Sequence, residues 1–338
     1  MDNSSHKGRL AYMDLLKGIA IFFVVIGHFV LFNWKGALDT HAVYKWIYSF
    51  HMPLFFFISG FFVEYTNRKQ YRTAEVKKIK GLVVPYFFWC LILDCYIQGS
   101  FDISLILTMN AGRYWFLWML FFFCSCYYFC DYIVGKMKDV KFLVPILLKV
   151  LLFMSFFCLG YFVYPCQLFY RGAQFGLFFL CGSFACQYDI IEKLKEKSLF
   201  SSIMFAVFIV SSLAYMNLQS VALNKLMKFV AGFSAIFSFS LYANSGVVNY
   251  ENKFIKAIIY CGRNTIVIYL VHMPLLQVLS DGLIPLTYFT PFWTFVISLA
   301  ASVVVVSFCV FLGEIFKNFT ILDRLVFGRQ WKTKTLNQ

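Results

Sequence analysis

The stretch Tyr12–Trp34, YMDLLKGIAIFFVVIGHFVLFNW, decides the fold of this chain. It is mostly apolar, and at about 1.5 Å per helical residue it is long enough to cross a hydrocarbon core of about 30 Å. Asp14 and Lys17 lie at its entry, and His28 lies near its far end. An ionisable side chain is costly inside hydrocarbon, so it normally faces the protein interior and marks a functional site. His28 is therefore the first candidate for a catalytic residue.

The composition of the whole chain extends this interpretation. Of its 338 residues, 61% are hydrophobic and 14% are charged, and the mean hydropathy is +0.73. A soluble domain is nearer half apolar and a quarter charged. We therefore expect an all-α, polytopic helical membrane protein, with a single membrane-embedded domain over residues 1–338. No separate soluble domain and no cleavable signal peptide are expected.

Apolar segments that could span a membrane recur along the chain, and we predict about ten transmembrane helices. They cover residues 15–33, 43–64, 82–97, 114–134, 142–163, 172–187, 200–217, 229–247, 257–278 and 292–316. Most of the 30 Lys and Arg residues fall in alternate connections, on the side of the N-terminus. Cytoplasmic loops carry such an excess, so both termini are expected to be cytoplasmic. This distribution explains the net charge of +14 without nucleic acid as a partner.

Three of the five histidines, His28, His51 and His272, fall in separate predicted spans. Counted along straight helices from the inner end of each span, they lie at about 21, 20 and 24 Å. The three imidazoles are thus predicted at a similar depth, with Asp94 roughly level with them. A histidine with a pKa near 6.5 can accept a hydroxyl proton at neutral pH and return it, which suits acyl transfer.

The roles of these residues stay open at this point. Each histidine could be an isolated polar residue bonded to a backbone carbonyl. Three histidines could also bind a metal, by analogy with catalytic zinc, although no local ligand spacing supports this and no metal is expected. Asp94 could orient a catalytic imidazole as the third member of a relay, or be a carboxylate at the outer water boundary.

A basic segment precedes the third predicted span. Arg72, Lys77, Lys78 and Lys80 cluster there, and Pro85 follows. These charges could simply anchor the protein by attraction to anionic membrane lipids. Alternatively they could bind the phosphates of a polyanionic cytoplasmic cofactor, with Pro85 breaking the helix beside them.

Five motifs together resemble the membrane acyltransferase family three, whose members commonly O-acetylate bacterial surface glycans. They are Asp14-Leu-Leu-Lys17 with Gly27-His28, Phe50-His51-Met-Pro53, Lys77-Lys-Ile-Lys80 with Pro85-Tyr86, Trp115-Phe-Leu, and Gly262-Arg-Asn-Thr265 with Tyr269 and His272-Met-Pro274. Their order and spacing extend over about 260 residues of the chain. The chain departs from the family in having Lys17, and lysines within the basic motif, where arginine is often found.

The resemblance implies a function and a location. It implies an O-acetyltransferase of the bacterial inner membrane that moves an acetyl or short acyl group from cytoplasmic acyl-CoA, such as acetyl-CoA, to a surface glycan or lipid-linked saccharide. It makes His28 catalytic, and the position of Asp94 along the chain makes that residue the expected third member of the relay. Expected cofactor-binding residues are Lys17, Arg72, Lys77, Lys78 and Lys80. Expected substrate-binding residues are His51, Trp115, Tyr269 and His272.

Two functions from other classes compete with this one. A proton-coupled transporter or lipid-linked glycan flippase would use the three histidines as proton relays or substrate contacts. A purely structural membrane scaffold would need none of them. Release of free thiol from acetyl-CoA distinguishes the enzyme from both.

Overall fold

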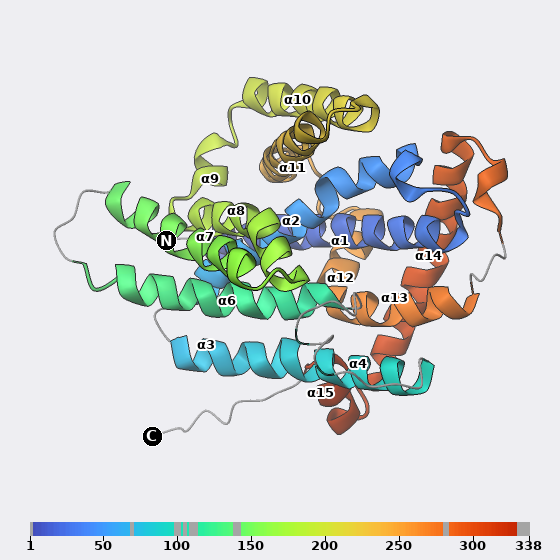
Figure 1. The fold of residues 1–338 in the computed structure, drawn as a ribbon, viewed down its shortest axis with the longest axis horizontal. Coiled ribbons are helices and arrows are strands. Elements are labelled where there is room, and N and C mark those ends of the chain that lie inside the picture. Colours follow the sequence, from blue (N-terminus) through green and yellow to red (C-terminus); the bar gives the residue numbers. More distant parts are fainter. Residues whose placement is uncertain are drawn as a thin grey trace. The chain divides into compact units, whose positions relative to one another are not determined.

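A computed structural model describes residues 3–67, 71–97, 103, 107, 114–137, 143–279 and 284–329, with the backbone alone at 3–10, 39, 66–67 and 94–97. The described residues are almost entirely helical and contain no β-strand, which confirms the predicted all-α class (Figure 1). The α-helices are α1 Asn3–Asn33, α2 Ala42–Asn67, α3 Tyr71–Lys78, α4 Val84–Ile97, α6 Trp115–Val134, α7 Leu143–Val163, α8 Gln167–Gln187, α9 Ile190–Leu194, α10 Ser198–Asn217, α11 Val221–Asn244, α12 Lys253–Arg263, α13 Thr265–Leu279, α14 Pro291–Phe316 and α15 Thr320–Phe327. The short helices are η1 Leu38–Thr40, η2 Ile79–Val83 and η3 Leu286–Tyr288.

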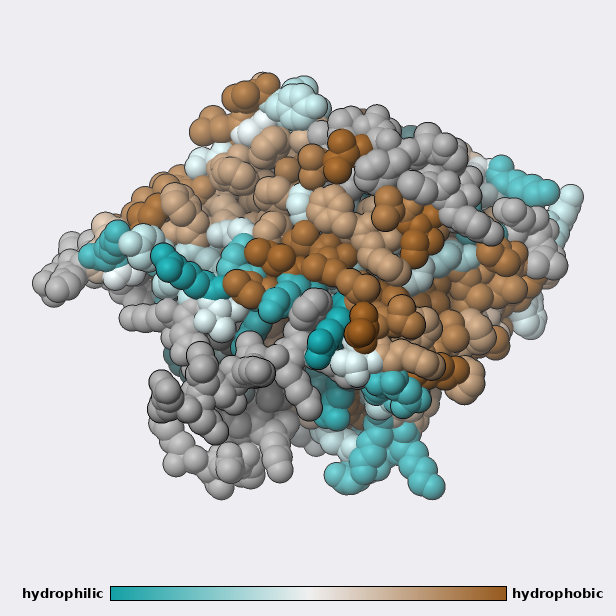
Figure 2. All heavy atoms as spheres, turned by 90° about the horizontal axis from the view of Figure 1, so that it is seen from below, coloured by the Kyte–Doolittle hydropathy of each residue, from teal (hydrophilic) through white to brown (hydrophobic). Residues whose placement is uncertain are grey.

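Seven of the described helices are long and apolar enough to cross a membrane, and the bent pair α12–α13 would make an eighth. Large apolar side chains such as Leu147 and Leu151 on α7 and Val210 on α10 are exposed. Figure 2 shows apolar surface over much of the face that it draws. These findings confirm a polytopic helical membrane protein. The predicted spans 82–97 and 172–187 are helical as α4 and α8, but neither is among the seven, and the total of ten stays a prediction.

The chain divides into two compact units. Unit 1 contains Met1–Ile58 and Phe184–Glu314, and unit 2 contains Ser59–Ser183 and Ile315–Gln338. The expectation of one membrane-embedded domain over the full chain stays a prediction. His28, His51 and His272 lie in unit 1, and the basic segment before α4 lies in unit 2.

In unit 1, α1 packs against α11, α12 and α13. Two glycines allow its backbone to touch that of α12. A Cβ on Gly18 would lie 2.1 Å from the carbonyl oxygen of Ile258, and one on Gly262 would lie 1.9 Å from that of Asp14. Small residues at a helix crossing permit this approach, which is common between membrane helices. The contact fixes α1 beside the start of α13.

The predicted span 257–278 is not one straight helix. It is bent by 80° between α12 and α13, at Asn264. The backbone N–H of Asn264 donates to the carbonyls of Tyr260 and Cys261, and its own carbonyl accepts from Val267 and Ile268. Asn264 therefore ends one helix and begins the next. The depth of 24 Å expected for His272 was counted along one unbroken helix, and that assumption was wrong.

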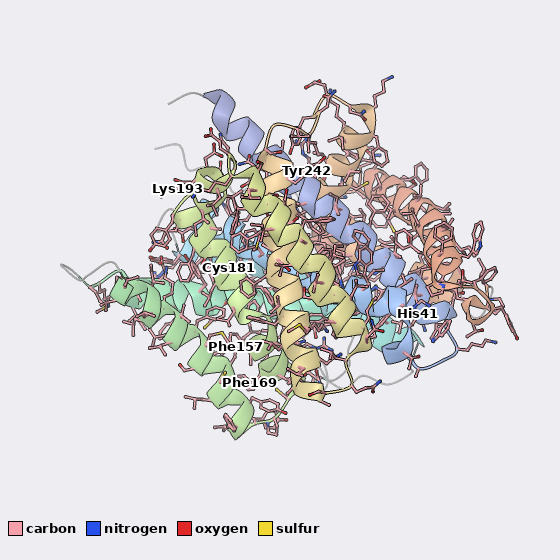
Figure 3. All side chains as sticks on the ribbon, turned by 90° about the horizontal axis from the view of Figure 1, so that it is seen from above. His41, Phe157, Phe169, Cys181, Lys193 and Tyr242 are labelled. Atoms are coloured by element: carbon pink, nitrogen blue, oxygen red, sulfur yellow. The ribbon has the colours of Figure 1, made fainter. Side chains whose placement is uncertain are left out.

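In unit 2, α6 packs against α3, α7 and η2, and α3 and α6 run side by side in Figure 1. Four buried phenylalanines, Phe123, Phe153, Phe157 and Phe179, form the aromatic core of α6, α7 and α8. Phe157 and Phe169, both labelled in Figure 3, lie at the α7–α8 contact, where each ring faces a glycine of the other helix.

A wide helical turn joins α3 to α4. Residues Ile79–Val83 form a π-helix, in which the Val84 N–H donates to the Ile79 carbonyl. Pro85 lacks the N–H that would bond the Gly81 carbonyl in a regular α-helix, which gives a physical reason for the wide turn. Pro85 itself lies within α4, so the expected helix break is replaced by a π-turn just before it. The helix α15 packs on this turn and on α4.

Candidate active site

Two of the predicted histidines are in direct contact in unit 1. The Nδ1 atom of His28 on α1 lies 2.7 Å from the Nε2 atom of His272 on α13, and the two ring planes differ by 15°. His272 is fully buried, whereas His28 is partly exposed. His28 is therefore the imidazole of this pair that another molecule can reach.

The backbone decides where the protons of this pair lie. The Nδ1 atom of His272 is 2.8 Å from the Ile268 carbonyl, which can only accept, so that nitrogen must donate. A neutral His272 then has a lone pair on Nε2 and accepts from Nδ1–H of His28. This leaves Nε2 of His28 unprotonated. The arrangement Ile268–His272–His28 thus presents one imidazole lone pair, as a general base requires.

Two further predicted residues lie around this pair. His51 on α2 is buried, its Nδ1 atom is 2.7 Å from the Ile47 carbonyl, and its ring centroid lies 4.6 Å from that of Tyr48. The Tyr269 ring centroid lies 6.0 Å from that of His272. A Cβ on Gly27 would lie 3.0 Å from the Tyr48 ring, so α1 and α2 approach closely beside His28. The structure therefore gathers His28, His51, Tyr269 and His272 in unit 1.

An ion cluster lies at the other end of the α1 span. Lys17 Nζ is 2.5 Å from Asp14 Oδ1 across an i,i+3 spacing on α1, and Arg263 Nε is 3.1 Å from Asp14 Oδ2. Sequence reasoning did not find the Arg263 contact, because the partners are 249 residues apart. Both carboxylate oxygens of Asp14 are thus bonded. Lys17 as a cofactor-binding residue stays a prediction.

The predicted basic residues lie in unit 2, along α3 and η2. Arg72 and Lys77 are exposed, whereas Lys78 and Lys80 are partly buried. Arg72 has no ion pair or hydrogen bond in the described part of the chain. The segment therefore presents cationic side chains beside a π-turn, a feature that is frequent at functional sites.

Trp115 and Asp94 belong to unit 2, whereas the three predicted histidines belong to unit 1. Trp115 begins α6 in unit 2, where its ring stacks on Phe175 and the Arg171 guanidinium lies 4.2 Å from its centroid. Asp94 lies within α4, but its side chain is outside the described residues, so its role in a relay stays a prediction. The group that contacts His28 is His272.

Unit 2 also contains a buried charged network that sequence reasoning missed. Lys149 on α7 is 4% exposed, and its Nζ lies 2.6 Å from Asp131 Oδ1 and 3.4 Å from the Tyr127 hydroxyl. Tyr127 also donates to Glu64, and Tyr71 on α3 donates to Asp131 Oδ2 at 3.0 Å. The only sequence signal was a lysine near the end of an apolar span.

Metal coordination was one of the open alternatives. Among the residues that the structure describes, no group of three or more His, Cys, Asp or Glu side chains is arranged to hold a metal ion.

Comparison with known proteins decides the family. A model described as an acyltransferase domain matches residues 10–312. This chain belongs to the membrane acyltransferase family three. Relatives include "Nodulation protein NolL" of Sinorhizobium fredii (strain NBRC 101917 / NGR234), which is 30% identical over 174 residues, or 44% of this chain and 47% of the relative. The protein of the same name from Mesorhizobium japonicum (strain LMG 29417 / CECT 9101 / MAFF 303099) is 32% identical over 120 residues, or 32% of each.

The matches cover less than half of either relative, and no solved structure matches. The family to which the chain belongs is one of acyltransferases. The family match favours the enzyme over the transporter and the scaffold.

Proposed function

We propose that this acyltransferase moves an acetyl or short acyl group from cytoplasmic acyl-CoA to a hydroxyl group of a surface or lipid-linked glycan. We further propose that it acts in the bacterial inner membrane. The observation that carries the proposal is the hydrogen-bonded arrangement Ile268–His272–His28, because it leaves Nε2 of His28 as an accessible base.

The proposed reaction uses His28 twice. Nε2 of His28 takes the proton from the acceptor hydroxyl while its oxygen attacks the thioester carbonyl of the donor. The carbon–sulfur bond then breaks, and the departing thiolate takes the proton back from Nε2. An acyl-imidazole formed on His28 before transfer is the variant of this reaction. His272 and the Ile268 carbonyl would hold the tautomer through both steps.

The other proposed roles follow from charge and position. Arg72, Lys77, Lys78 and Lys80 would bind donor phosphates, with arginine forming a bidentate fork and lysine acting as a point charge. Lys17 would contribute to donor binding beside Asp14. His51, Tyr269 and Trp115 would contact the acceptor, and Asp94 would act in the proton relay.

Purified protein tests the chemistry. Given acetyl-CoA and a glycan acceptor, it should release free thiol, and His28→Ala should lower that rate by roughly 100-fold to 10,000-fold, the usual contribution of a general base. His41→Asn is a matched control, since His41 is a buried histidine outside the cluster that caps α2 and is labelled in Figure 3. Thiol release that survives in His28→Ala would refute the proposed base.

A cellular experiment tests the acceptor class. Mass analysis of surface glycans should show the loss of an acetyl ester in a strain that lacks the gene, and its return with the wild-type gene. Complementation with the His28→Ala gene should leave the ester missing. Identical glycans in all strains would contradict the proposed acceptor.

A further inference from the structure

A pocket of about 440 Å³ lies in unit 2, between faces of α3 and α6. Its lining residues recur at helical spacing on each helix: Tyr71, Arg72 and Glu75 on α3, and Ser125, Tyr128, Phe129 and Tyr132 on α6. The Tyr71 ring centroid lies 6.2 Å from that of Tyr128 and 6.2 Å from that of Tyr132. The pocket therefore has aromatic walls that could hold a flat ring.

These walls are held in place by groups behind them. Tyr71 donates to Asp131, and Asp131 pairs with the buried Lys149. The Ser125 hydroxyl donates to Glu75 Oε1 at 2.5 Å, which holds the Glu75 carboxylate against α6. These bonds fix the positions of Tyr71 and Glu75 in the pocket wall.

Two polar groups of the pocket lack partners within the described residues. Tyr128 is 4% exposed, and its hydroxyl is buried without a hydrogen bond. Arg72 lines the same pocket without an ion pair or hydrogen bond. A buried hydroxyl without a partner costs free energy, and such an atom in a native protein calls for an explanation. A ligand that bonds this hydroxyl would provide one.

The chemistry of the lining selects the kind of ligand. A guanidinium favours phosphate, whereas the Glu75 carboxylate beside it would repel a simple anion. A ligand with a flat ring, an amino group and a separate phosphate satisfies all of these groups. The ring would lie against the tyrosines, the amino group would donate to Glu75, and the phosphate would bind Arg72.

We propose that this pocket binds the adenosine 3′,5′-bisphosphate end of the acyl donor. This inference rests on the proposed function for the identity of the donor and deepens it by separating recognition of the nucleotide from the chemistry at His28. Tyr128 and Glu75 then become nucleotide-specificity residues, and neither was singled out from the sequence.

A truncated donor isolates the pocket. S-acetylpantetheine carries the thioester but lacks the nucleotide, so it needs His28 but not this pocket. Tyr128→Phe should raise the KM for acetyl-CoA by about fivefold to tenfold, the range of one net hydrogen bond, and leave the KM for S-acetylpantetheine unchanged. Glu75→Gln should behave in the same way. Tyr288→Phe, at an exposed tyrosine in η3, is the matched control.

Direct binding tests the site without an acceptor. Adenosine 3′,5′-bisphosphate should bind the purified protein in calorimetry, and Tyr128→Phe, which removes only a hydroxyl without a partner, should weaken it by the same factor. Equal KM changes for both donors, or binding that ignores Tyr128 and Glu75, would overturn the pocket assignment while acyl transfer stands. Tyr128-dependent binding without thiol release would support the pocket and refute the proposed function.

Discussion

The histidine pair of unit 1 and the Lys149 network of unit 2 are both buried polar clusters in an apolar protein. They differ in how many of their polar atoms have hydrogen-bond partners. In unit 1, one backbone carbonyl satisfies His272, and the last nitrogen of His28 stays available. In unit 2, Lys149, Asp131 and Tyr71 satisfy one another. On the proposed function, an available nitrogen distinguishes the cluster that reacts, whereas mutual pairing distinguishes a cluster that holds helices together.

The largest expected effect is a loss of activity at His28 without a loss of stability. His28→Gln removes the base but keeps a polar side chain, so thiol release should fall by about 100-fold or more while the unfolding temperature changes little. Thiol assays and thermal unfolding of the same detergent-solubilised sample measure both. A large fall in unfolding temperature would mean that His28 is part of the packing instead.

Breaking the Lys149 network of unit 2 should mainly lower the stability of the protein. Asp131→Asn leaves the ammonium of Lys149 buried without its charged partner, which should cost about 3 kcal/mol of unfolding free energy. The double variant Asp131→Asn/Lys149→Met removes the stranded charge and should recover most of that loss in thermal or denaturant unfolding. A double variant no more stable than Asp131→Asn would show that the pair does not act as a unit.

A smaller effect is expected at the α1–α12 crossing. Gly262→Ala places a Cβ 1.9 Å from the Asp14 carbonyl, so the helices must separate, at a cost of about 1–3 kcal/mol. Gly81→Ala is a control for unfolding measurements, because its Cβ would meet nothing closer than 4.0 Å. Equal unfolding temperatures for the two variants would contradict the close crossing.

The smallest effect concerns Tyr71. Burial, reinforced by the Asp131 carboxylate, raises the pKa of Tyr71 from 10.0 to about 12. Its raised pKa stabilises the folded state fully below pH 10, and this contribution is lost as pH rises toward 12. Tyr71→Phe should therefore cost about 1 kcal/mol, constant from pH 6 to pH 9 and shrinking above pH 10. Unfolding titrations at several pH values would measure this, and a difference that varies below pH 9 would assign it to another group.

Sequence reasoning found the features that are written locally. The apolar spans and the i,i+3 pair of Asp14 and Lys17 follow from residue types along one helix. The choice of His28 as a catalytic candidate has the same origin and stays a prediction. It also placed His272 near His28, although by counting along a helix that proves to be bent. Gly262 and Asn264 within an apolar run were the signal of that bend.

The features that it missed depend on contacts between helices. Lys149 resembled a boundary residue, because nothing in the sequence pairs it with Asp131 on another helix. The tautomer of His28 depends on the Ile268 carbonyl, and the pocket depends on the faces that α3 and α6 turn toward each other. Such information arises only once the chain has folded.

Because the chain bends at Asn264, the elbow between α12 and α13, the directions of the side chains on α13 are counted from that bend. His272 lies two helical turns beyond the elbow, so its direction is set by the phase of that short segment and not by the length of α12. One residue inserted between the elbow and His272 would rotate the imidazole by about 100° away from His28. A change of length in the loop before α12 would leave both that phase and the α1–α12 contact at Gly18 and Gly262 intact, so this loop can vary while the geometry of the histidine pair is preserved.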